Sequence, residues 1–407
     1  MKTLIKNIGN IYTPVANRPY GTVAHWQNKQ LLISDGVMVS VLDQKDAEPE
    51  ADTIIDARGY TLLPGFVDAH THPVFWQTRE KEFIMRVQGK SYEEIAAAGG
   101  GIRNSVRRFR EADKKAIKEV TRERIRLFPE FGVTTIEAKS GYGLSTEDEI
   151  KALEIIGELN REESLDLIPT FLGAHEVPDE YQHDRQAYIR LLTDEMIPLI
   201  AERKLAEYCD IFCEKDVFSV EESRIILKSA LDHQLKLRVH ADELFAFGAA
   251  EMAAELGAVT ADHLVKISDR GIEAIAAAGV IPVLLPGTTF FLGKDEYAPA
   301  RKMIKAGCRV AISTDFNPGS SATQNLQLMW TIAALKMGLL PDELLWATTL
   351  VPAISLGLND RIGTIEPGKQ ADLVLLDIPN LDYLAYHYGI NHTYMTIKKG
   401  KILCRRG

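Results

Sequence analysis

The chain has 407 residues, of which 46% are hydrophobic, and it carries a formal net charge of −10. This length suits a barrel of about 250 residues with additions, and the apolar content indicates a well-cored globular protein. Because nucleic acids and anionic membranes attract basic surfaces, the acidic balance argues against both as partners.

The four cysteines form neither a C-x-x-C pair nor a disulfide-type spacing, so we expect them to be reduced and buried. The N-terminal residues lack a signal-type apolar segment, and no apolar run approaches transmembrane length. We therefore expect a cytoplasmic protein.

The first sixty residues read as short strands separated by turn residues, as in a meander. We expect these strands at 3–8, 22–27, 30–34, 37–42 and 53–56. A segment of this size cannot form a large core by itself, so it needs a partner elsewhere in the chain.

From residue 62 to 357, apolar strand-like segments alternate with charged helical segments. We expect strands at 65–69, 133–138, 166–172, 208–212, 236–240, 259–263, 281–285 and 309–313. We expect helices at 111–128, 146–162, 186–203, 220–232, 245–256, 268–278, 300–306 and 322–336. Eight such alternations predict an α/β protein with a (β/α)8 barrel, whose functional residues lie where the strands end.

Short strands return after the barrel, at 363–366, 372–376, 395–398 and 401–404. The simplest interpretation pairs this tail with the first strands. We therefore expect residues 1–61 and 358–407 to form one small β-sandwich domain, with the barrel spanning residues 62–357.

Two histidines separated by one residue, His70 and His72, end the first barrel strand. Side chains at i and i+2 of a strand share a face, so the two imidazoles lie side by side. Imidazole is the commonest ligand of catalytic metals, and an open site needs about three protein ligands. His240 and Asp315 follow other strands, so the four residues are candidate ligands. A carboxylate among imidazoles suits one zinc or iron ion.

Two further residues lie near the expected metal. His263 ends a strand and is either a fifth ligand or a hydrogen-bond donor beside the reacting water, whose pKa a metal lowers to about 7. Glu243, three residues beyond His240, is placed to face the substrate and is a candidate base, as is Asp315. Lys139 could be carbamylated to bridge two metals, but its surroundings read as a substrate loop, which favours one metal.

Two candidate anion sites flank the expected metal. The forked guanidinium of Arg79 suits a carboxylate, and Tyr142 and His175 follow neighbouring strands and could complete the clamp. Residues 317–321 precede a helix that we expect to begin near Ala322, where free N–H groups would attract an anion. Together the two sites indicate a small substrate that carries one carboxylate and gains another.

Segments 64–72 and 363–373 resemble the amidohydrolase superfamily, and residues 60–400 more narrowly resemble the imidazolonepropionase family. The specific motifs lie at 137–144, 172–175, 240–243, 261–264, 297–301 and 314–320. The resemblance implies a cytosolic, usually dimeric enzyme of histidine degradation. It implies that water opens the ring of 4-imidazolone-5-propanoate to give N-formimidoyl-L-glutamate.

The resemblance also implies a role for each matching residue. The implied metal ligands are His70, His72, His240 and Asp315. The implied substrate contacts are Arg79, Tyr92, Tyr142, His175, Glu243, Asn317, Gly319 and Ser320, and His263 lies near the reacting carbonyl. The chain departs from the family pattern at 76–77, at Glu176 and at 350–352.

Two other functions fit parts of this pattern. A ring deaminase of the cytosine or guanine type shares the histidine, glutamate and aspartate layout, but its nucleobase substrates carry no carboxylate for the clamp. A metal-free scaffold or ligand-binding protein is expected to have lost some of the metal-ligating residues, whereas all four are present here. Metal analysis separates this last alternative from the enzymes.

Overall fold

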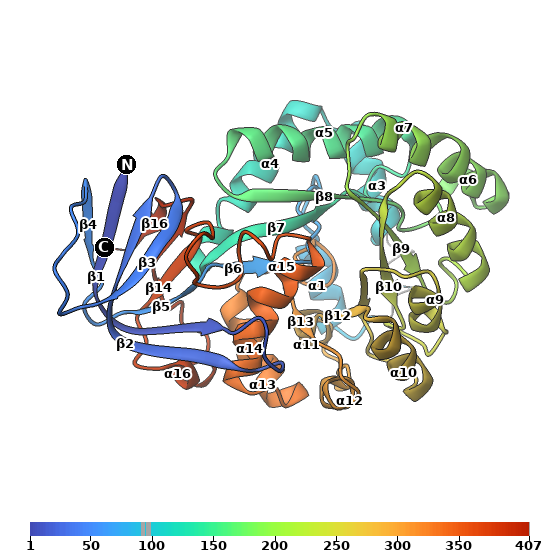
Figure 1. Cartoon of the computed structure of the whole chain (residues 1–407). Coiled ribbons are helices and arrows are strands. Elements are labelled where there is room, and N and C mark those ends of the chain that lie inside the picture. Colours follow the sequence, from blue (N-terminus) through green and yellow to red (C-terminus); the bar gives the residue numbers. More distant parts are fainter. Residues whose placement is uncertain (91–93, 95–98, 407) are drawn as a thin grey trace.

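The computed structural model describes residues 1–90, 94 and 99–406 of the chain, and these residues form two eight-stranded sheets. In Figure 1 one sheet lies at one end of the molecule together with both termini, and the other lies among the helices. The expected division into a barrel and a small β domain from both chain ends is confirmed.

The terminal sheet has the strand order β16-β15-β14-β5-β1-β2-β3, and β4 also pairs with β1. Its strands are β1 (Lys2–Pro14), β2 (Val23–Ser34), β3 (Val37–Asp43), β4 (Thr53–Asp56), β5 (Thr61–Pro64), β14 (Leu373–Leu376), β15 (Thr393–Lys398) and β16 (Lys401–Arg405). The predicted domain boundary at residues 61 and 62 falls inside β5. The expected strand at 363–366 is wrong, because Gly363 turns the chain there with a φ of 93°.

The barrel strands run in parallel in sequence order, so each strand neighbours the next one along the chain. They are β6 (Phe66–Asp68), β7 (Val133–Lys139), β8 (Asp166–Ala174), β9 (Tyr208–Cys213), β10 (Lys236–Ala241), β11 (Thr260–His263), β12 (Ile281–Leu284) and β13 (Ala311–Ile312). All eight expected strands are present. The ring closes where the His72 N–H donates to the Phe316 carbonyl (2.8 Å) and the Asp315 N–H donates to the His70 carbonyl (3.1 Å).

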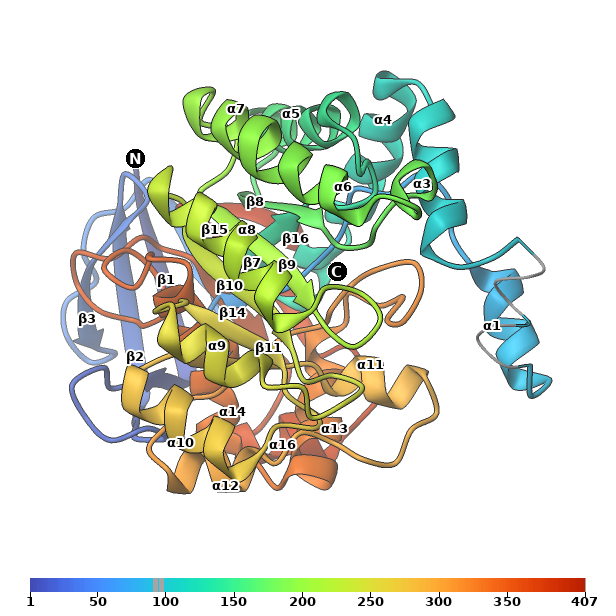
Figure 2. The same cartoon turned by 90° about the vertical axis from the view of Figure 1, so that its right-hand side faces the viewer.

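Most of the helices cover the outside of the barrel (Figures 1 and 2). The described residues form fifteen α-helices. They are α1 (Glu80–Val87), α3 (Ile102–Glu111), α4 (Lys114–Ile125), α5 (Thr146–Glu162), α6 (Arg185–Leu191), α7 (Ile197–Glu202), α8 (Val220–Asp232), α9 (Ala249–Glu255), α10 (Asp269–Ala278), α11 (Pro286–Phe291), α12 (Ala300–Lys305), α13 (Leu326–Met337), α14 (Pro341–Thr348), α15 (Leu350–Ser355) and α16 (Leu381–Tyr386). In Figure 2, α1 extends away from the other helices.

Four expected helices differ from the structure. The helix expected at 111–128 is shorter and spans Lys114–Ile125, because the Asp113 side chain accepts from the Lys115 and Ala116 N–H groups and caps the start of α4. The helix expected at 186–203 is interrupted by a π turn at Leu192–Met196. The helices expected from 245 and 322 begin later, at Ala249 and Leu326.

A buried lysine joins the two sheets. Lys398 of β15 is 1% exposed, and its Nζ lies 2.6 Å from Asp372 and 2.7 Å from Asp166, which begins barrel strand β8. Cys209, Cys213 and Cys308 are buried as expected, but Cys404 is partly exposed. Within the described parts of the chain, every helix is too short or too polar to cross a membrane.

Candidate metal centre

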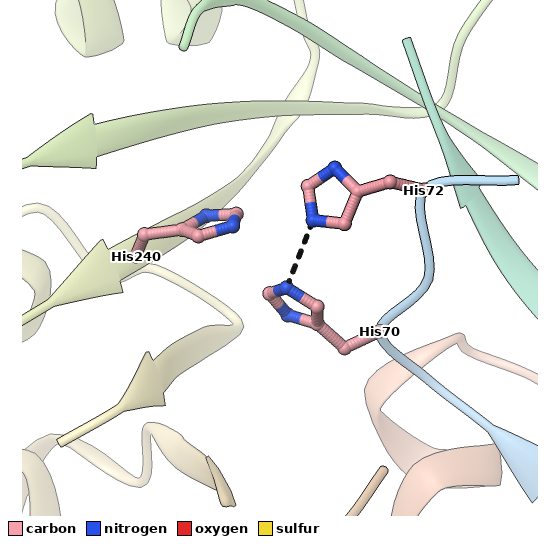
Figure 3. A group of neighbouring side chains, drawn as sticks. All are labelled: His70, His72 and His240. Atoms are coloured by element: carbon pink, nitrogen blue, oxygen red, sulfur yellow. Dashed lines mark hydrogen bonds between the residues drawn. The ribbon is translucent and has the colours of Figure 1, made fainter. Parts of the chain in front are cut away.

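Three of the predicted ligands converge where β6 and β10 end, as Figure 3 shows. The Nε2 atoms of His70 and His72 are 3.3 Å apart, and Oδ1 of Asp315 lies 3.5 Å from each. Ligand atoms in a tetrahedral site with bonds of about 2.0–2.1 Å are separated by about 3.3–3.4 Å. These separations therefore match a site for one ion, and His240 completes a group of three histidine nitrogens within 4.8 Å of one another.

Two buried aspartates orient the histidines. Nδ1 of His70 donates to Oδ2 of Asp262 at 2.6 Å, and Nδ1 of His240 donates to the Asp210 carboxylate, with Oδ2 at 3.1 Å. A proton held at Nδ1 leaves Nε2 with a free lone pair for a metal. Nε2 of His240 is buried and has no hydrogen-bond partner among the described residues. The donor set therefore fits a divalent cation.

Asp315 is held by both its backbone and its side chain. Its φ of 53° lies in the left-handed region, which costs free energy for a residue other than glycine. Oδ2 accepts a short hydrogen bond from the Thr288 hydroxyl, which leaves Oδ1 directed at the histidines. His263 also has a positive φ, of 71°, so two site residues share this strained conformation.

Burial keeps most of the histidines neutral. Burial and then the nearby charge of Lys139 lower the pKa of His70 well below its usual value, and burial and His175 do the same for His72. Burial also lowers the pKa of His263 to about 3. For His240, burial lowers the pKa, but the attraction of Asp210 outweighs it and the net shift is upward.

His263 and Glu243 lie together beside the ligands. Nδ1 of His263 is 3.6 Å from Oε2 of Glu243, and burial raises the pKa of the glutamate. A ligand atom of His263 also lies within 4.8 Å of those of His70 and Asp315. The geometry therefore leaves His263 able to contact either a metal or a substrate.

The expected carboxylate clamp is partly assembled. The His175 ring stacks on His72 at 5.4 Å between centroids, and the Tyr142 ring lies 5.6 Å from His175. Nδ1 of His175 donates to the Gly141 carbonyl, and burial lowers its pKa to about 3. Arg79 is oriented by Glu82, and its Nη1 lies against Gly319, where an added Cβ would come within 2.5 Å of it.

The second expected anion site differs from the prediction. Because α13 begins at Leu326, no helix starts at residues 320–322. The Gly319 and Ser320 N–H groups both donate to Oδ1 of Asn317 at 2.8 Å. The expectation of free N–H groups at a helix start near Ala322 is therefore wrong, although this loop does lie next to Asp315, whose carbonyl accepts from Asn317 Nδ2.

Some residues fall outside the predictions, and one prediction cannot be placed. Tyr92 lies outside the described residues. Lys139 donates to two carboxylates, a contact that sequence reasoning did not foresee. Asp210 and Asp262 were also missed, and the signal for them was an acidic residue inside an apolar strand. Thr288 had no comparable signal.

Comparisons with known proteins agree with this geometry. Residues 61–403 match the model of the amidohydrolase family. The chain is 43% identical over 400 residues to an imidazolonepropionase from Caldanaerobacter subterraneus subsp. tengcongensis, covering 97% of this chain and 96% of the relative. It is 44% identical over 412 residues to one from Geobacillus kaustophilus, covering 100% and 97%.

Solved structures show the same fold at much lower identity. E. coli guanine deaminase superposes with a TM-score of 0.76 at 16% identity, with both chains fully covered. An adenosine deaminase from Xanthomonas campestris with bound zinc has a TM-score of 0.69 at 20% identity, covering 98% of this chain and 92% of the other. At these identities the likeness establishes the fold alone.

Proposed function

The chain belongs to the amidohydrolase family and within it to the imidazolonepropionases, and from this premise we propose how its residues carry out the reaction. The enzyme hydrolyses the cyclic amide bond of 4-imidazolone-5-propanoate to give N-formimidoyl-L-glutamate, a step of histidine degradation. The observation that carries the assignment of roles is the set of ligand-atom separations of 3.3 and 3.5 Å around one point.

We propose that His70, His72, His240 and Asp315 bind one divalent ion, either zinc or iron. Such an ion, when bound, polarises a carbonyl and lowers the pKa of water to about 7. The two imidazoles with protonated Nδ1 atoms present Nε2 to it, and the carboxylate of Asp315 supplies negative charge. Nitrogen and oxygen ligands of this kind suit both metals.

The clamp residues hold the propanoate chain of the substrate. Arg79 offers charged N–H groups, and Tyr142 and His175 lie together on the neighbouring loops. The Arg79 guanidinium lies against the 317–320 loop, so it would hold the carboxylate next to that loop. Asn317, Gly319 and Ser320 then lie where the new carboxylate forms. The Ser320 hydroxyl, 3.2 Å from Asn317 Oδ1, is the donor that turns most easily.

The proton transfers use the remaining residues. Water adds to the ring carbonyl carbon, the carbon–nitrogen bond breaks, and the leaving nitrogen receives a proton. His263 lies beside the oxyanion that develops at the carbonyl, and Asp315 or Glu243 carries the proton to the nitrogen. Glu243 lies next to His263, with Oε2 3.6 Å from Nδ1, so the two proposed roles belong to neighbouring side chains.

We also propose a cytoplasmic homodimer with no nucleic acid or membrane partner. The support is the acidic balance of the chain and the metabolic role of its relatives. The dimer is tested by sedimentation velocity at micromolar concentration. A monomer at every concentration would contradict it.

Consumption of 4-imidazolone-5-propanoate, followed by its ultraviolet absorbance, tests the proposed role of the metal. The purified protein should consume this compound, lose activity after chelation and regain it with zinc or iron. Full activity in a metal-free preparation would overturn the assignment. The deaminase alternative rests on fold likeness alone, and deamination of guanine or cytosine in the same assay would revive it.

A further inference from the structure

A buried cluster of charges lies beneath the candidate metal centre, on the inner face of the barrel. Its members are Glu137, Lys139, Asp210, Arg238 and Asp262, and the side chains are 0% exposed. Ionised groups are almost never fully buried unless they are paired, because removal from water is costly. These charges are therefore paired with one another, and none of them has a role in the proposed hydrolysis itself.

Lys139 is the centre of this arrangement. Its Nζ lies 2.6 Å from Oε1 of Glu137 and 2.6 Å from Oδ2 of Asp210. Burial lowers the pKa of Lys139, but the attraction of Asp210 and Glu137 outweighs burial and raises it, so the group is an ammonium ion. Two short contacts to carboxylates therefore fix its position.

Each of the two carboxylates leads to metal-ligating residues. Asp210 accepts from Nδ1 of His240 at 3.1 Å. Glu137 accepts at Oε2 from the N–H of Thr71, the residue between His70 and His72, at 3.3 Å, and its carbonyl accepts from the Thr71 hydroxyl at 2.5 Å. The Lys139 ammonium thus links the carboxylate that contacts the loop after β6 to the carboxylate that contacts His240 of β10.

We propose that Lys139 is a positioning residue that sets the spacing of the metal ligands. Its ammonium holds Asp210 against His240 and Glu137 against the backbone between His70 and His72. The Nε2 atoms of the three histidines then face one point before any ion binds. This inference rests on the proposed function, because it concerns the ligands assigned there.

The test measures metal affinity rather than turnover. Lys139→Met keeps the length of the side chain and removes its charge, and Asp210→Asn removes the acceptor charge at nearly constant shape. Zinc dissociation constants are measured by chelator competition for the wild type, both single variants and the double variant. Groups that orient metal ligands contribute about 10- to 100-fold in affinity, so each single variant should weaken zinc binding by that factor.

The double variant separates positioning from independent effects. If Lys139 acts through Asp210, the double variant should bind zinc no more weakly than the weaker single variant. Cobalt-loaded Lys139→Met should also show a d–d absorption spectrum shifted from that of the wild type, because the ligand spacing has changed. Unchanged zinc affinity in a folded Lys139→Met protein, or losses that multiply in the double variant, would overturn the proposal.

A matched control comes from Lys398, the other buried lysine held by two carboxylates. Lys398→Met should lower the melting temperature and leave zinc affinity unchanged, since it lies at the sheet boundary. If Lys139→Met does not fold, the zinc affinity of Asp210→Asn is compared with that of the double variant. The double variant removes one positive and one negative buried charge, so it keeps the charge of the cluster balanced. Equal zinc affinities support the proposal, and a further tenfold loss contradicts it. Failure of the proposed function would appear separately, as wild-type protein that binds no metal or two ions per chain.

Discussion

The Arg79 guanidinium donates to a single carboxylate oxygen of Glu82, with Nε at 2.9 Å and Nη2 at 2.5 Å. The other oxygen of Glu82 accepts from the Gly101 N–H at 3.1 Å. The side edge of Arg79 is therefore occupied, while Nη1 remains directed towards Gly319. Glu82 thus orients the arginine that we assign to the substrate carboxylate.

Replacement of Arg79 by alanine should raise KM by about 10- to 100-fold, the effect of losing one hydrogen bond to a charged group of about 1.5–3 kcal/mol. The metal content and most of kcat should be retained, because Arg79 does not contact the ligands. Steady-state kinetics with metal analysis checks this. Arg86→Ala, in the last turn of the helix that follows Arg79 and stacked on Phe291, is the control and should leave KM unchanged. An unchanged KM for Arg79→Ala would remove Arg79 from the clamp.

Gly319→Ala should also raise KM, by a smaller factor. The new methyl group would come 2.5 Å from Nη1 of Arg79, so the guanidinium must move away from the loop. The clash involves the end of a flexible side chain, so stability should change little. Gly157→Ala, in the middle of α5 with its nearest contact at 3.6 Å, is the control and should leave KM as in the wild type. Identical kinetics for both variants would show that the position of Arg79 is not critical.

His240→Ala should lose metal and activity together, because Nε2 of His240 has no role in the described structure other than to face the other two histidines. Metal content is measured by elemental analysis of dialysed protein, alongside the ultraviolet assay. His233→Ala removes an exposed histidine at the end of α8 and should match the wild type in both. Retention of one ion per chain in His240→Ala would exclude His240 as a ligand.

Removal of the metal should destabilise the protein. A ligand that binds only the folded state adds about 4 kcal/mol of stability when present at about 1,000 times its dissociation constant. Chelated protein should therefore melt at a lower temperature than protein supplied with excess zinc. Differential scanning calorimetry on both forms measures this. Equal melting temperatures would mean that no tight site exists.

The ion pairs between α4 and α5 predict a pH-dependent contribution to stability. Glu158 lies 2.8 Å from Lys114 and 2.7 Å from Lys118, and hydrogen bonds from these two lysines lower its pKa from 4.5 to about 2. A carboxylate whose pKa is lower in the folded state stabilises the fold at pH values above its unfolded-state pKa. This stabilisation is lost as the pH falls towards the folded-state pKa. The contribution should be full above pH 4.5 and lost by about pH 2.

Glu158→Gln should therefore lower the stability at pH 7 by about 0.5–1 kcal/mol, the range for partly exposed pairs in a network. The difference from the wild type should shrink as pH falls below 4.5, as measured by thermal unfolding at several pH values. Glu273→Gln, on an exposed position of α10, should show no such dependence. A difference that is constant with pH would show that the ion pairs do not contribute.

The barrel could be predicted because its parallel strands are buried on both faces and so appear as short apolar runs. The exact starts of the helices could not be predicted, because they depend on single capping residues. Asp113 looks like any other polar residue in a charged helical stretch, yet its side chain starts a new helix. The strand expected at 363–366 is absent for a similar local reason, a backbone turn at Gly363 that only glycine adopts easily.

The candidate ligands could be predicted because each one ends a strand, and strand ends converge in a barrel. The residues that orient them required knowledge of strand neighbours. Asp210 reaches His240 only because β9 pairs with β10. Glu82 reaches Arg79 through the fold of a short helix, and the 317–320 loop uses its own N–H groups internally. These last two contacts are local, in contrast to the one between Asp210 and His240. The i,i+3 spacing of Arg79 and Glu82 favours an ion pair at a helix start, and asparagine commonly accepts from N–H groups two or three residues on.

The pairing of β5 with β14 limits when the terminal sheet can form during protein synthesis. Leu63 and Val374 are partners in that ladder, so the first strand group leaves the ribosome long before its neighbour exists. Until the whole barrel has been synthesised, the edge of β5 that pairs with β14 has no hydrogen-bond partner. A chain that ends before β14 would therefore lack a complete terminal sheet and leave its N-terminal strands without their partner, although it would contain every proposed metal ligand.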